Sequence, residues 1–103
     1  MLAALKLAND IEAGRLKPRD VVEMCADAIA RNDESIGAFE TCDIEQVRRD
    51  AGKAGLEKLP LRGLPVGIKD IFDTADVPTR YGSGIYARHQ PASDAAMVML
   101  VDR

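Results

Sequence analysis

A single lysine, Lys69, lies inside the most apolar and most glycine-punctuated stretch of the chain, residues 61–73. A lysine in such a run has two interpretations. In the first, its stem lies along apolar surface while its ammonium reaches water or pairs with Asp70 or Asp73. In the second, the lysine is buried and carries a proton during catalysis. Its position alone favours the first interpretation.

The catalytic interpretation requires a neutral amine at neutral pH. A free lysine side chain has a pKa near ~10.4, so only about one in 2,500 is neutral at pH 7. Lowering such a pKa to near 7 takes about 4 to 5 kcal/mol of discrimination against the charged form, which burial in low dielectric can supply. A neutral lysine can then accept a proton from a serine hydroxyl, directly or through a relay. The apolar residues around Lys69 offer this environment: Val66, Ile68, Ile71 and Phe72.

The run Gly-Leu-Pro-Val-Gly-Ile-Lys-Asp at residues 63–70 resembles the N-terminal lysine motif of the amidase signature family. Similar segments occur in the family's order at residues 73–79, 81–83 and 91–95. The helices and short strand that we expect before the motif fit the family as well, so the resemblance covers nearly the whole chain.

By this resemblance, Lys69 matches the lysine of the family's Ser–cis-Ser–Lys triad. In the family, the lysine acts through the bridging serine to activate a nucleophilic serine, which attacks an amide carbonyl. Ammonia or an amine leaves, and water hydrolyses the acyl-enzyme while backbone N–H groups of a glycine-rich loop stabilise the oxyanion.

Both family serines lie in a Gly/Ser-rich segment well downstream of the lysine motif, and these 103 residues hold no such segment. The serines here are Ser35, Ser83 and Ser93. Ser83 matches a Gly-Ser pair near the family's active site, although a turn residue that binds local backbone is the favoured interpretation. Ser83 and Asp70 are also candidates for residues that surround Lys69. His89 is expected to be an exposed loop residue without a partner.

The sequence supports two hypotheses for the function. In the first, the chain is the N-terminal part of an amidase-like carbon–nitrogen hydrolase that carries the triad lysine, lacks both serines and is inactive alone. A glutaminase-type subunit of a tRNA-dependent amidotransferase is one relative to consider, and the substrate of a completed triad would be a small amide. The alternative is a non-catalytic module, derived from an amidase, that associates with itself or with a partner. A complementing chain that supplies the serine segment is a third, weaker hypothesis.

Length, composition and charge indicate which other classes of protein are excluded. The length suits one small domain over residues 1–103. The net charge is −3 and basic residues are scattered, so we expect no nucleic-acid partner. No apolar run approaches the ~20 residues of a membrane span, and no signal peptide is visible. Cys25 and Cys42 are interpreted as reduced thiols of a cytoplasmic protein, with Cys25 in the core. One histidine and no closely spaced cysteine pair argue against a metal site. We also expect no cofactor.

Hydrophobic periodicity predicts an α/β fold in which N-terminal helices pack on a few short strands. The resemblance implies that this would be a partial amidase-signature fold. The first two helices are expected to pair as an antiparallel hairpin. Because so few strands cannot complete a sheet in one chain, we expect a homodimer. The predicted helices cover residues 2–13, 18 to about 32, 44–57 and a last segment capped by Ser93 or Asp94. The predicted strands cover residues 37–42 and 66–72, and residues 73–92 are expected to form an irregular loop.

Overall fold

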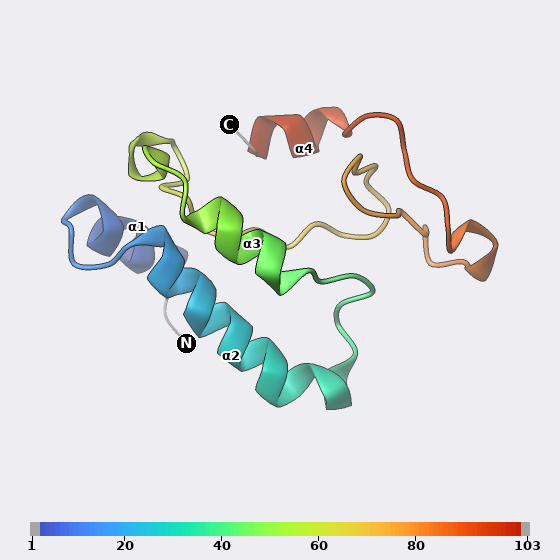
Figure 1. The fold of residues 1–103 in the computed structure, drawn as a ribbon, viewed down its shortest axis with the longest axis horizontal. Coiled ribbons are helices and arrows are strands. Elements are labelled where there is room, and N and C mark those ends of the chain that lie inside the picture. Colours follow the sequence, from blue (N-terminus) through green and yellow to red (C-terminus); the bar gives the residue numbers. More distant parts are fainter. Residues whose placement is uncertain (1–2, 102–103) are drawn as a thin grey trace. The chain divides into compact units, whose positions relative to one another are not determined.

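The computed structural model describes residues 3–101, which divide into two compact units, up to Pro65 and from Val66 onward. Within these residues the first unit contains α1, α2, α3 and the 3-10 helix η1, and the second contains the 3-10 helix η2 and α4 (Figure 1). The bounds are α1 Ala4–Glu12, α2 Pro18–Ile36, α3 Ile44–Ala51, η1 Leu56–Lys58, η2 Gly84–Tyr86 and α4 Ala96–Val101.

Helix α2 is the longest element, and its ends explain its length. Pro18 occupies the first turn, where a missing N–H leaves no hydrogen bond unmade. The backbone N–H of Lys17 donates to the Asp20 carboxylate at 2.8 Å. The helix ends at Gly37, whose φ of 66° is left-handed and suits glycine. It therefore runs about one turn beyond the predicted end near residue 32.

Helices α2 and α3 lie side by side and form the main packing of the first unit (Figure 1). Val21, Val22 and Ala26 of α2 are buried in this unit, as is Ile11 of α1. Helix α1 contacts η1 more extensively than it contacts α2. The expected hairpin of the first two helices is therefore not the main packing of this unit.

Helix α3 begins as predicted and ends earlier. The carboxylate of Asp43 accepts a hydrogen bond from the Gln46 N–H at 3.1 Å, which confirms the expected N-cap. The helix stops at Ala51 because the glycines beyond it weaken any continuation, and Gly55 takes a φ of 86°. The predicted extension to residue 57 is therefore wrong, and a separate 3-10 turn replaces it.

Gly63, the first glycine of the lysine motif, is held in a tight site of the first unit. It comes directly after Arg62 in a turn in which both residues have positive φ, 55° and 74°, and the Leu64 N–H donates to the Leu61 carbonyl at 3.0 Å. A Cβ on Gly63 would lie 2.9 Å from side-chain atoms of Pro18 and of Leu56.

The α/β prediction is wrong, because residues 3–101 contain helices and irregular segments but no strand. The first expected strand, residues 37–42, is irregular. In the second, residues 66–72, the Phe72 N–H donates to the Lys69 carbonyl at 3.1 Å, so the chain turns where an extended strand was expected. A strand requires a neighbouring backbone along its length. Within the described residues, the backbone of this segment pairs with another backbone segment only where the Asp70 carbonyl accepts the Tyr81 N–H.

The second unit is built around Thr79, which is 1% exposed. Its hydroxyl oxygen accepts the Thr74 N–H at 3.2 Å and its backbone N–H donates to the His89 carbonyl at 2.9 Å. Helix α4 begins at Ala96, so the predicted caps are wrong. The Asp94 carboxylate instead accepts the Ala75 N–H at 2.8 Å. The expected continuation of this helix to residue 103 lies partly outside the described residues.

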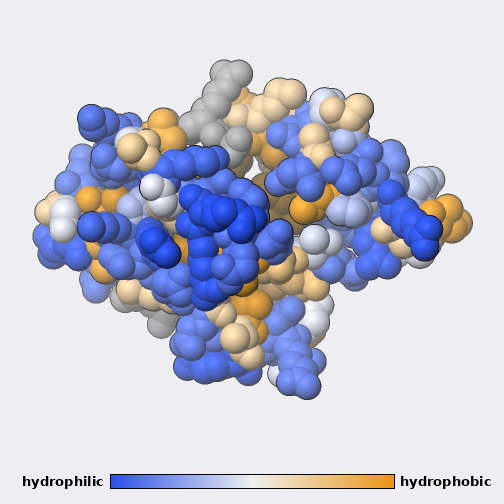
Figure 2. All heavy atoms as spheres, viewed as in Figure 1, coloured by the Kyte–Doolittle hydropathy of each residue, from blue (hydrophilic) through white to orange (hydrophobic). Residues whose placement is uncertain are grey.

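Apolar side chains remain open to solvent in both units. Figure 2 shows such side chains among larger hydrophilic areas on the face in view. Cys25 and Cys42 are both exposed, so the expected core position of Cys25 is wrong; the buried positions of α2 near it are Val22 and Ala26. Between residues 3 and 101, no helix is both long enough and apolar enough to cross a bilayer.

Replacement of Thr79 by valine tests the role of its hydroxyl. The valine keeps the size of the side chain but leaves the Thr74 N–H without its acceptor, so we expect a loss of about 1–3 kcal/mol in the free energy of unfolding. Urea unfolding followed by circular dichroism measures the change. Thr41→Val, at an exposed position, is the matched control. Equal stability of the two variants would contradict this assignment.

Candidate active site

Lys69 is exposed, on a turn at the start of the second unit. Among residues 3–101, no side chain forms a hydrogen bond or an ion pair with its ammonium, so neither Asp70 nor Asp73 is its partner there. The described residues therefore do not bury Lys69 as proton transfer would require. Its catalytic role remains a prediction.

Asp70 connects the lysine turn to the segment that precedes Ser83. One carboxylate oxygen, Oδ1, accepts the Arg80 N–H at 2.9 Å, and the backbone carbonyl accepts the Tyr81 N–H at 2.9 Å. The second oxygen, Oδ2, is buried and has no hydrogen-bond partner in the described part of the chain. Asp70 thus accepts hydrogen bonds from the backbone of residues 80 and 81 and is not a charge partner of Lys69.

The turn over residues 80–83 has a demanding backbone. Tyr81 and Gly82 both have positive φ, 54° and 73°, and the Ser83 N–H donates to the Arg80 carbonyl at 3.0 Å. Two consecutive positive φ angles with this hydrogen bond are typical of a type I′ turn. Glycine adopts such a φ at no cost, whereas a tyrosine must be held there. The Tyr81 hydroxyl donates to the Asp73 carboxylate, which supplies one restraint.

Ser83 follows this turn and is the N-cap residue of η2. Its hydroxyl oxygen accepts the Ile85 N–H at 3.3 Å, which confirms the prediction of a turn residue that binds local backbone. No hydrogen bond joins Ser83 to Lys69 among the described residues. The turn therefore accounts for the local role of Ser83, and any role near Lys69 remains a prediction.

His89 is exposed as predicted, but it has aromatic neighbours that sequence reasoning missed. Its ring centroid lies 5.8 Å from that of Tyr81 and 6.2 Å from that of Tyr86. The two tyrosine rings meet edge to face at 5.3 Å. The three residues are unevenly spaced along the sequence, with Tyr86 in η2, so no periodic pattern could have revealed the cluster.

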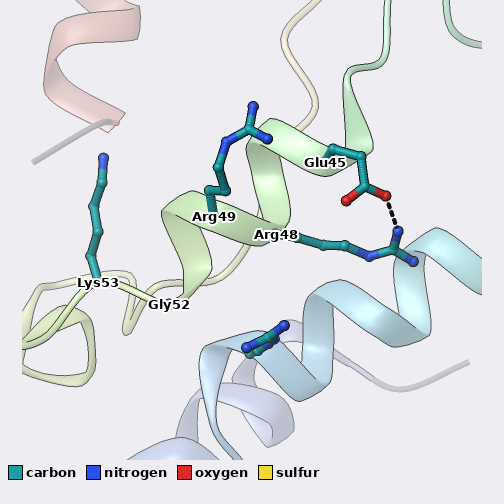
Figure 3. Close-up of a pocket in the computed structure, with 6 residues that line it drawn as sticks. Glu45, Arg48, Arg49, Gly52 and Lys53 are labelled. Atoms are coloured by element: carbon teal, nitrogen blue, oxygen red, sulfur yellow. Dashed lines mark hydrogen bonds and ion pairs between the residues drawn. The ribbon is translucent and has the colours of Figure 1, made fainter.

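A second candidate site is an open cavity of about 340 Å³ beside α3, with a basic lining (Figure 3). Arg48 reaches α2, where Nε and Nη2 bind Glu23 at 2.8 and 3.1 Å, and its Nη1 binds Glu45 at 2.5 Å. Arg49 and Lys53 project away from α2 (Figure 3). The cavity is lined by Arg19, Glu45, Arg48, Arg49, Gly52 and Lys53.

Ion pairing accounts for most of these charges. Hydrogen bonds from Arg48 hold the pKa of Glu23 below its usual value, and Glu23 and Glu45 raise the pKa of Arg48. Likewise, the hydrogen bond from Lys53 lowers the pKa of Asp50. The lining contains no serine, cysteine or histidine, and its one carboxylate, Glu45, is paired with Arg48. This cavity is therefore mainly a charge-paired surface, and the Lys69 region remains the better candidate. Groups of three or more metal-ligating side chains are absent from the described part of the chain.

Comparison with known proteins identifies the class. The Amidase family model matches residues 20–103, and the chain belongs to this family. The resemblance expected from the lysine motif is therefore confirmed.

Particular relatives make the match more specific. The chain is 34% identical to the A subunit of glutamyl-tRNA(Gln) amidotransferase from Salinispora arenicola (strain CNS-205), an alignment that covers 94% of the chain and 21% of that relative. It is 32% identical to the AtzE subunit of 1-carboxybiuret hydrolase from Pseudomonas sp. (strain ADP), an alignment that covers 94% of the chain and 23% of AtzE. The chain thus spans about a fifth of the length of these relatives.

A solved structure agrees with this assignment. It is described as an unexpected vestigial protein complex that reveals the evolutionary origins of an s-triazine catabolic enzyme. It matches 97% of this chain and 23% of its own, with a TM-score of 0.86 and 29% sequence identity.

The hydrogen bond between Tyr81 and Asp73 predicts a shifted titration. Asp73 accepts this bond from the neutral phenol, which raises the pKa of Tyr81 above its usual value near 10. A raised pKa means that the stabilising contribution is complete below about pH 10 and is lost as the pH rises through the shifted value. Absorbance titration in a Tyr86→Phe background, where Tyr81 is the remaining tyrosine, measures this pKa. Asp73→Asn should lower it, whereas Asp76→Asn should not; an identical midpoint in all three proteins would contradict the assignment.

Proposed function

We propose that this chain is the lysine-bearing part of an amidase-type carbon–nitrogen hydrolase and that it hydrolyses nothing alone. The observation that carries the proposal is the lysine motif, residues 63–70, which lies inside the segment that matches the amidase family. Two further observations support it: the chain aligns with about a fifth of the length of its relatives, and it lacks the serine-rich segment that a triad needs. Two serines must therefore be supplied outside these 103 residues, by a complementing chain or by further sequence.

In this proposal Lys69 is the proton carrier of the completed triad. Its exposure in the described chain fits a group whose cover is contributed by another segment. An apolar segment placed over Lys69 would remove water from the ammonium and favour the neutral amine. The amine could then take a proton through a bridging serine, which activates the nucleophile for attack on a small amide. Asp70 and Ser83 are proposed to surround this lysine.

A chimera tests the role of Lys69. Residues of this chain replace the matching segment of the Salinispora arenicola amidotransferase subunit, and release of ammonia from small amides is measured. We expect activity in the chimera and a fall in kcat of about a hundredfold or more for Lys69→Ala, since proton transfer contributes that much in many enzymes. Lys58→Ala, at an exposed lysine of η1, is the control and should leave the rate unchanged. Full activity of the Lys69→Ala chimera would reject the proposal.

The isolated chain provides a separate test. Purified 103-residue protein should show no turnover of amides, because a proton carrier without its nucleophile cannot form the acyl-enzyme. The measurement is ammonia release at high protein concentration. Turnover that disappears in the Lys69→Ala variant would overturn the prediction of inactivity.

A second candidate function is a non-catalytic module that associates with itself. The observation that favours it is the apolar surface of the second unit. Ile85 is 89% exposed and Leu100 is 69% exposed, and Met97 and Met99 of α4 are also open. A helix that is apolar on several sides is ordinarily covered.

Light scattering over a concentration series separates the two functions. A defined homodimer that is weakened by Leu100→Glu, with Ala92→Glu as an exposed control, would support the module. The buried charge would oppose association, because an unpaired carboxylate is costly to remove from water. A monomer at every concentration would exclude self-association.

A further inference from the structure

We propose that Asp70 is a positioning residue that fixes the turn carrying Ser83 against the segment carrying Lys69. This inference rests on the proposed function, since it assigns a role around the same lysine. It goes further because it names the contact that sets the geometry and separates the two acceptor groups of Asp70.

The geometry of Asp70 carries the proposal. One residue accepts two consecutive backbone N–H groups, those of Arg80 and Tyr81, each at 2.9 Å. The acceptors differ, because the carboxylate binds Arg80 and the main-chain carbonyl binds Tyr81. Asp70 directly follows Lys69 in the chain, and Ser83 lies two residues beyond Tyr81. A shift at this contact therefore moves the serine relative to the lysine.

Little apolar packing is available to do the same work. Lys69, Tyr81 and Gly82 are exposed, so core packing contributes little at the turn itself. The buried Thr79 just before the turn is a further polar restraint, because its hydroxyl binds the Thr74 N–H and the Phe72 carbonyl. The Asp73 carboxylate adds a polar restraint, since it accepts a hydrogen bond from the Tyr81 hydroxyl. Asp70 thus holds the backbone of the turn and Asp73 holds a side chain of the same turn.

The second oxygen of Asp70 makes the proposal specific. Oδ2 is buried without a hydrogen-bond donor among the described residues, which is an unfavourable arrangement. The carboxylate thus binds the Arg80 N–H through Oδ1 while its other oxygen is shielded from water. An asparagine keeps Oδ1 as an acceptor and loses the charge, whereas an alanine loses both. Comparison of the two variants separates the hydrogen bond from the charge.

Positioning has a kinetic consequence in a completed active site. Groups held in a productive arrangement avoid an entropic cost when the reaction begins, and a displacement of about 1 Å can cost about a hundredfold in rate. Loss of the Asp70 contact is therefore expected to lower kcat while substrate binding is retained.

Amide hydrogen exchange in the full chain tests the contact itself. We expect Asp70→Ala to speed exchange at Arg80 by about tenfold, because its N–H loses the carboxylate acceptor. Exchange at Tyr81 and Ser83 should also become faster as the turn loosens, although the backbone acceptors of these two amides remain. Asp70→Asn should retain protection at Arg80 because its side-chain oxygen still accepts. Amides of α2 report separately on the first unit, and Asp76→Ala is the exposed control. Unchanged protection in Asp70→Ala, or equal loss in the alanine and asparagine variants, would overturn the proposal.

The chimera tests the consequence for catalysis. Asp70→Ala should lower kcat by about ten- to a hundredfold with KM unchanged, and Asp70→Asn should recover most of the rate. An active, Lys69-dependent chimera that is insensitive to Asp70→Ala would reject the positioning role and leave the proposed function standing. A chimera without activity would reject the proposed function, and the exchange measurement would then decide the role of Asp70 alone.

Discussion

The second unit depends on hydrogen bonds that pair its backbone N–H groups, because an irregular backbone has no neighbouring strand to pair with. Side chains accept where a neighbouring strand would otherwise accept. The Thr79 hydroxyl accepts a hydrogen bond from the Thr74 N–H. The carboxylates of Asp70 and Asp94 accept from the N–H groups of Arg80 and Ala75, respectively. These contacts are few and each is specific, so the unit is ordered by individual side chains rather than by a repeated backbone pattern.

The first unit meets the same requirement in another way. Its helices satisfy most of their own backbone groups, and its packing needs only a narrow apolar stripe with a few buried residues such as Val21 and Val22. Arg48 of α3 then links the two main helices through Glu23. Substitutions in this unit should therefore be tolerated more readily than substitutions at the three acceptors of the second unit.

This contrast explains how much of the structure could be predicted. The starts of α2 and α3 were predictable because Pro18 and Asp43 act through contacts within a few residues. The family and the candidate lysine were predictable because the motif is contiguous. The strands were not, since residues 66–72 have an apolar composition that suits a strand but turn at Lys69. Whether an apolar run is extended depends on distant backbone partners, which its own residues do not specify.

In the candidate site, too, local features were predictable from the sequence and contacts between distant residues were not. Lys69 and Ser83 were found from local sequence, and the turn role of Ser83 is explained by its glycine neighbours. The contacts of Asp70 to residues 80 and 81 and the ring cluster around His89 bring together residues that are separated along an aperiodic loop. No spacing rule connects such positions. The geometry therefore adds what the motif lacks, namely the pairing between its aspartate and the serine turn.

The tight site around Gly63 has a consequence for genetics. This glycine belongs to the lysine motif, yet its neighbours are Pro18 and Leu56 of the helical unit and not the lysine. A bulkier residue there would collide with the start of α2 while Lys69 remained chemically intact. In a screen for activity such a variant would resemble a catalytic mutant, although its defect would lie in how much folded protein accumulates. If this glycine were invariant among amidases, its invariance would therefore reflect selection for correct folding as well as for catalysis.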